Sequence, residues 1–108
     1  MTALTIARTA AVLTAVGTVG YLFPAGLFRT DNIFLIPDLL LSLLLLLAAA
    51  APARYAVTDL LCAFCFAGGV LVTAVSWYAV DGRVGPGALL GAVTSAVMAA
   101  VLIRRRPA

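Results

Sequence analysis

The sequence contains no histidine, no lysine and no glutamate among its 108 residues. Without histidine, the chain lacks the side chain that most often acts as a general base near neutral pH, and the most common metal ligand. Any acid–base chemistry would depend on four aspartates, two cysteines, hydroxyl groups or arginines. We therefore expect a protein that is not an enzyme and that holds no catalytic site, metal or cofactor.

Charge of any kind is also scarce, because only 10% of the residues are charged whereas 65% are hydrophobic. The mean hydropathy is +1.19. A soluble domain of this size needs more polar surface to cover its core, so the composition indicates an integral membrane protein in contact with the lipid bilayer. The net charge of +3 lies in loops and chain ends, and we expect no nucleic-acid partner. Arginine without lysine, in an alanine-rich chain, is typical of a high-GC bacterium. We expect the protein to lie in the inner membrane of such a cell.

Four apolar segments have the length of about 20 residues that a helix needs to cross a bilayer core of ~30 Å. They span residues 4–28, 33–51, 56–80 and 87–103, and the segments between them are rich in proline, glycine, arginine and aspartate. The sequence therefore predicts an all-α membrane protein, a single four-transmembrane-helix antiparallel bundle over residues 1–108.

The arginines predict the orientation of this bundle. With four spans, both termini and the loop between the second and third spans lie on one side of the membrane. That side holds five arginines and the other side two. The five are Arg8, Arg54, Arg104, Arg105 and Arg106, and the two are Arg29 and Arg83. Because arginine is enriched in cytoplasmic loops, both termini are predicted to be cytoplasmic.

Small residues mark the expected helix contacts, since close backbone approach drives helix association in lipid. The fourth span has them at every fourth position, and the third span has them near heptad spacing. The predicted packing residues are Gly87, Gly91, Ser95 and Ala99 in the fourth span and Gly69 in the third. We expect this ridge to pack within the bundle, and homodimerisation is the alternative.

The second span is different, because leucine surrounds it on almost every side between Leu39 and Leu47. Such a helix either faces lipid or docks into a groove of a partner protein. In the first span, alanines at every fourth position, Ala7, Ala11 and Ala15, form a second narrow stripe.

Asp38 precedes the leucine run and has two interpretations. If the second helix begins at Ile33, Asp38 lies more than one turn into hydrocarbon, where an acidic side chain is costly and usually functional. If the helix begins at Pro37, proline takes the first helical position and the Asp38 carboxylate lies near the positive end of the helix dipole. We expect the second arrangement. Tyr21 and Trp77 lie on the same predicted side as Asp38, with Arg29 or Arg83 within reach, and define a possible proton or ligand site.

Two further motifs are expected to be structural. Thr58–Asp59 has the composition of an N-terminal cap for the third helix. Cys62 and Cys65 have the CxxC spacing of thiol–disulfide exchange. However, they fall at the predicted cytoplasmic end, which is reducing, and no histidine or lysine is present to activate them. We interpret both cysteines as small, buried packing residues.

The leading functional hypothesis is a structural or accessory subunit of a larger membrane complex, with a membrane-protein partner or a homo-oligomer. The alternative is a small homo-oligomeric, proton-coupled transporter that uses Asp38. A third hypothesis is a thiol–quinone oxidoreductase that uses Cys62 and Cys65. The surroundings of Asp38 discriminate between the first two. A water-accessible cap favours the subunit, and a cavity that also contains Tyr21 or Trp77 favours the transporter.

Overall fold

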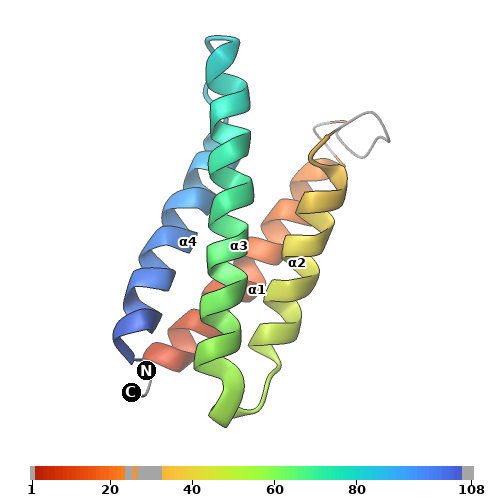
Figure 1. The fold of residues 1–108 in the computed structure, drawn as a ribbon. Helices are drawn as coiled ribbons and strands as arrows, with labels where there is room; N and C mark the ends of the chain where they lie inside the picture. Colours follow the sequence, from red (N-terminus) through yellow and green to blue (C-terminus); the bar gives the residue numbers. More distant parts are fainter. Residues whose placement is uncertain (1, 24–25, 27–32, 106–108) are drawn as a thin grey trace.

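The computed structural model describes residues 2–23, 26 and 33–105, and the described chain is helical throughout apart from short connections. Its helices are α1 (Ala3–Leu22), α2 (Leu35–Ala49), α3 (Ala53–Val80) and α4 (Pro86–Arg105). They run alternately up and down, so that the start of α1, the end of α4 and the α2–α3 connection share one end of the bundle (Figure 1). The predicted all-helical fold with four helices is confirmed.

The four helices differ in length. Helices α1, α3 and α4 are long and apolar enough to cross a membrane, whereas α2 has only 15 residues. At 1.5 Å per residue, α2 extends over about 22 Å, less than a bilayer core of ~30 Å. The predicted second span, 33–51, is therefore helical only in its middle. The predicted first span extends past the end of α1 into residues that lie outside the described part of the chain.

Proline lies in the first turn of both α2 and α4, but at different positions. Pro86 is the first residue of α4, where its missing N–H is not needed. Pro37 is the third residue of α2 rather than the first, because α2 already begins at Leu35. The first-turn N–H groups of a helix have no intrahelical acceptor, so proline is tolerated at either position.

Helix α3 begins earlier than expected, and Thr58–Asp59 does not cap it. Pro52 is the N-cap residue, and its carbonyl accepts hydrogen bonds from the N–H groups of Tyr55 (2.9 Å) and Ala56 (3.0 Å). Asp59 is therefore an exposed residue in the second turn of a continuous helix. Proline supplies the helix start here because it stops the preceding segment and leaves its own carbonyl available.

Helix α3 ends in a tight left-handed turn. Gly82 has φ +70°, a conformation that glycine adopts without a steric penalty. The N–H of Gly82 donates to the carbonyl of Ala79 (2.9 Å), and the N–H of Arg83 donates to that of Tyr78 (3.0 Å). This is the Schellman arrangement, and it turns the chain directly towards α4.

The core fills the bundle from its middle to the end that holds the α2–α3 connection. The alanine stripe of α1 is buried, with Ala7 and Ala11 at 0% exposure. Larger side chains from the other helices pack in the same cluster: Leu41 and Leu45 from α2, Leu60 and Phe64 from α3, and Leu102 from α4. Helix α3 packs against both α2 and α4, and α1 packs mainly against α2. Within the described residues no Cα atom of α2 lies within 8 Å of one in α4, so these two helices lie diagonally opposite.

The small residues of α4 face α3 within the same chain. A Cβ atom at Gly91 would lie 2.7 Å from Leu71 Cδ1, so any other residue at this position would require the Leu71 side chain to shift. Ser95 is fully buried, and its Cβ lies 3.5 Å from where a Cβ at Gly68 would be. The α3 residue that meets Ser95 is therefore Gly68, whereas Gly69 is exposed with open space around it. Ala99 is partly buried against the core.

Many large apolar side chains lie on the outer surface of the bundle. Five of them are leucines of α2: Leu40, Leu43, Leu44, Leu46 and Leu47. Cys62 and Cys65 are exposed free thiols, and the expectation that they are buried is wrong. The inward face of α3 is set by Leu60, Phe64 and Ala67, and at 100° per residue both cysteines fall outside it.

Candidate functional site

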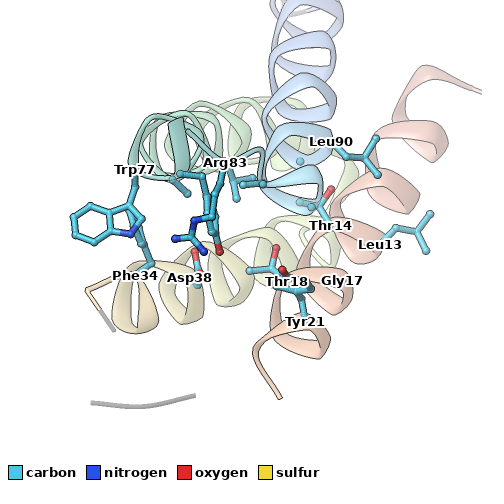
Figure 2. A pocket seen from close by; sticks show the side chains of 17 residues that line it. Leu13, Thr14, Gly17, Thr18, Tyr21, Phe34, Asp38, Trp77, Arg83 and Leu90 are labelled. Atoms are coloured by element: carbon cyan, nitrogen blue, oxygen red, sulfur yellow. The ribbon is translucent and has the colours of Figure 1, made fainter. Parts of the chain in front are cut away.

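A cavity of about 480 Å³ lies at the other end of the bundle, where α1 and α3 end and α2 and α4 begin (Figure 2). All four helices contribute to it, together with the α3–α4 turn. Its polar and aromatic lining residues are Thr14, Thr18, Tyr21, Phe34, Asp38, Trp77, Tyr78 and Arg83.

Glycines leave the space that becomes this cavity. Gly17 of α1 and Gly87 of α4 both line it, and a Cβ at either position would meet no atom within 4 Å. Gly87 was expected to pack against another helix, but in the described structure it borders the cavity. Buried side chains such as Leu71 and Ala74 border this hollow but do not fill it.

Asp38 lies in the first turn of α2, and its carboxylate faces the cavity. Its backbone N–H donates to the carbonyl of Phe34 (2.8 Å), and its own carbonyl accepts from Ser42 Oγ (2.8 Å). The carboxylate oxygen Oδ1 is buried and has no hydrogen-bond partner within the described structure. Asp38 is thus in the first turn, as expected, but its Oδ1 does not accept the backbone N–H bonds of a helix cap.

Among the lining residues that the structure describes, Arg83 has the only cationic side chain. Its Nη2 lies 3.3 Å from Asp81 Oδ2, and its guanidinium carbon lies 5.2 Å from the centre of the Tyr78 ring. The Tyr78 ring in turn lies against Gly85, where a side chain would collide with it. Within the described chain, Arg83 therefore forms its ion pair with Asp81 in the α3–α4 turn rather than with Asp38.

Aromatic side chains from α1, from α3 and from the N-cap position of α2 border the cavity. Tyr21 and Trp77 are about half exposed, at 49% and 52%. The Phe34 and Trp77 rings meet edge to face, with centroids 6.0 Å apart and planes at 78°. The structure thus places Tyr21, Asp38 and Trp77 in the lining of one cavity, whereas Arg29 lies outside the described residues.

Sequence reasoning did not assign Thr14, Thr18 and Tyr78 to this site. Thr14, Thr18 and Tyr21 are spaced by four and three residues, so they share one face of α1 near its end. Combined with the acid at the start of α2, this polar face is the signal that could have identified the first two. Tyr78 could not be assigned from residue spacing, because the position of its ring depends on its packing against Gly85 in the α3–α4 turn.

A smaller hollow of about 280 Å³ lies in the groove between α2 and α3. It is lined by Leu44, Leu47, Ala48, Asp59, Cys62 and Ala63. Asp38 and Asp59 therefore border different hollows, near opposite ends of α2, and do not form a carboxylate pair.

No protein-family model matches this chain, and neither the curated proteins nor the solved structures that were searched give a match.

Proposed function

We propose that the protein is an integral membrane protein of the bacterial inner membrane, a small homo-oligomeric, proton-coupled transporter whose ligand enters the end cavity. The observation that supports this is the carboxylate of Asp38, which has a buried oxygen without a hydrogen-bond partner in the wall of a 480 Å³ cavity. Ionisable groups in such positions are rare in membrane proteins and mark substrate or proton pathways.

The coupling follows from the energetics of the Asp38 carboxylate. An ionised oxygen that is buried without a partner lacks the hydrogen bonds that water would supply, which costs free energy. Either a proton or a ligand that bonds to the carboxylate offsets this cost. Because the proton and the ligand bind the same carboxylate, each is expected to exclude the other. This mutual exclusion is the minimal requirement for exchanging protons for ligand.

Four spans with both termini in the cytoplasm complete the proposal, supported by the arginine distribution and by the alternating helix directions. The cavity then opens towards the outer side. In a cysteine-free background, Val84→Cys should react in intact cells with a membrane-impermeant maleimide, and Arg105→Cys should not. Both positions are exposed, so the reverse labelling pattern would contradict this orientation.

Transport is tested in proteoliposomes that contain a pH-sensitive dye, with three probes of similar size: phenyltrimethylammonium, benzenesulfonate and phenylalanine. A gradient of at least one probe should drive proton movement through the wild-type protein. Asp38→Asn should abolish this movement, and Asp59→Asn should not. Proton movement that is equal in wild type and Asp38→Asn for every probe would refute the transporter.

A second candidate is an accessory subunit of a larger membrane complex, favoured by the outer surface of α2. Five exposed leucines cover a helix that is too short to cross a bilayer core of ~30 Å by itself. A partner helix seated on these leucines would shield both ends of α2 from hydrocarbon. Extraction in mild detergent and native mass spectrometry should then show one stoichiometric partner, which Leu43→Ala with Leu47→Ala should release.

A further inference from the structure

The lining of the end cavity also indicates which class of ligand it accepts. We infer that the cavity binds a small organic cation, an ammonium group attached to an apolar body. This inference deepens the proposed function and rests on it, since it concerns the same cavity. Three properties of the lining support it: the balance of charge, the aromatic rings and the apolar wall.

The charge that is left without a partner in the cavity is negative. Arg83 is matched by Asp81, whose Oδ2 lies 3.3 Å from its Nη2. Asp38 has no such match, because its Oδ1 is buried without a hydrogen bond inside the described structure. An anionic ligand would meet an arginine that is already paired and a carboxylate that repels it. A cation would instead supply the positive charge that the Asp38 carboxylate lacks.

The aromatic rings favour the same sign of charge, because the face of an aromatic ring attracts cations. One of the rings already shows this behaviour, since the Arg83 guanidinium lies 5.2 Å from the centre of the Tyr78 ring. Tyr21 and Trp77 bring two more rings to the lining, from α1 and α3. The hydroxyl oxygens of Thr14 and Thr18 add further partial negative charge to the lining.

The rest of the wall is apolar, which selects for a ligand with a hydrocarbon part. Leu13, Leu71, Ala74 and Leu90 come from three helices and line the cavity, and Leu13 and Leu90 lie away from Asp38 (Figure 2). A volume of about 480 Å³ suits an organic molecule and is far larger than a single metal ion or water molecule needs. The expected ligand therefore has one charged end, near Asp38, and one apolar end.

Trp77 makes this class directly testable, because it is the only tryptophan in the chain and lines the cavity. Its emission is measured for the full-length protein in phosphatidylglycerol nanodiscs, which contain no ammonium headgroup. The three probes are phenyltrimethylammonium, its neutral isostere tert-butylbenzene, and benzenesulfonate. We expect saturable quenching by the cation, binding at least tenfold weaker for the neutral isostere, and no saturable response to the anion.

Two variants assign the charge preference. Asp38→Asn keeps the shape of the side chain, and it should weaken binding of phenyltrimethylammonium at least tenfold while leaving that of tert-butylbenzene unchanged. Asp59→Asn borders the other hollow and should bind the cation like the wild type. Equal affinity for the cation and its neutral isostere, or no effect of Asp38→Asn on cation binding, would overturn the inference.

The ammonium group could belong to a free solute or to a lipid headgroup, and nanodiscs that contain phosphatidylethanolamine separate these sources. A lower apparent affinity for phenyltrimethylammonium there indicates a competing headgroup, an unchanged affinity indicates a solute, and both support a cation site. The result is also independent of transport. Cation binding without proton movement would refute the transporter alone, and proton movement driven only by benzenesulfonate, without cation binding, would refute the cation site alone.

Discussion

Each end of helix α2 has a charged side chain near the helix pole of opposite sign, but the two side chains are bonded differently. At its end, Arg8 of α1 donates from Nη1 to the carbonyl of Ala49 (3.0 Å), which places a cation at the negative pole of the helix. At its start, Asp38 lies in the first turn, yet its Oδ1 has no partner in the described structure. A charge that is hydrogen-bonded contributes to the fold. A charge whose oxygen remains unbonded beside a cavity is available to a ligand.

The packing around Arg8 is also denser than the packing around Asp38. Most of the fully buried large side chains, among them Leu45, Leu60 and Phe64, belong to the core on the Arg8 side of the cavity. Around Asp38, glycines and half-exposed aromatic rings take their place. We therefore expect the packed end to determine the stability of the bundle and the cavity end to determine binding. Four substitutions test this division, in order of decreasing effect on stability.

Phe64→Ala should have the largest effect, because Phe64 is fully buried in the packed core. Loss of its ring should lower the free energy of unfolding by about 3–5 kcal/mol, through lost contacts and a new void. Phe66→Ala, on the outer face of the same helix, should cost much less. Unfolding titrations with sodium dodecyl sulfate, followed by circular dichroism, measure both, and equal losses would contradict the division.

Gly91→Leu should be next, at the border between the core and the cavity, with a loss of about 1–3 kcal/mol from overpacking against Leu71. Gly69→Leu is the matched control, because it makes the same change of residue in α3 at a position with open space around it. Both variants gain helix propensity equally. The difference between their thermal midpoints in detergent therefore reports the contact itself, and identical midpoints would show that Gly91 is not a packing residue.

Arg8→Met should lower the free energy of unfolding by about 1 kcal/mol, since it removes a charge-assisted hydrogen bond to a partly buried carbonyl but keeps the aliphatic stem. Arg104→Met, an exposed residue in the last turn of α4, is the control. If both variants unfold alike, the contact with Ala49 is not stabilising.

Asp38→Asn should have the smallest effect on stability. The variant loses a favourable interaction with the helix dipole of about 0.3–1 kcal/mol, but it no longer buries an unbonded carboxylate oxygen. We expect these terms to cancel to within about 0.5 kcal/mol in the same unfolding titration. A loss well above 1 kcal/mol would mean that Asp38 is a structural cap after all.

The sequence was sufficient to predict the helices, because apolar runs separated by proline and glycine leave few alternatives in a chain this hydrophobic. It was less informative about which side of α3 faces inward. Gly68 and Gly69 are adjacent, so residue spacing alone does not decide which of them meets Ser95. The rotation of α3 about its axis that turns Gly68 towards Ser95 also leaves both cysteines exposed. The direction that each face takes depends on neighbouring helices, which a single stretch of sequence does not contain.

The cavity was harder still to foresee. Asp38, Tyr21 and Trp77 could be grouped because each lies near the same predicted membrane surface. However, whether such residues enclose a space depends on the tilt of the helices and on glycines such as Gly17 and Gly87, which leave volume unfilled. Arg83 was considered as a partner of Asp38, but its ion pair is with Asp81, two residues away along the same turn.

The unequal helix lengths have a consequence for the surrounding lipid. Helix α3 has 28 residues, about 42 Å, beside the 15 residues and about 22 Å of α2. In the proposed four-span arrangement, one flat bilayer would not match both helix lengths. Acyl chains next to α2 would then compress or be replaced by shorter ones, while α3 would tilt or project from the surface. The bundle should therefore collect short-chain lipids along one flank and thin the leaflet where α2 begins. In bilayers of graded thickness, both the incorporation of the protein and its transport activity should depend on the length of the lipid acyl chains.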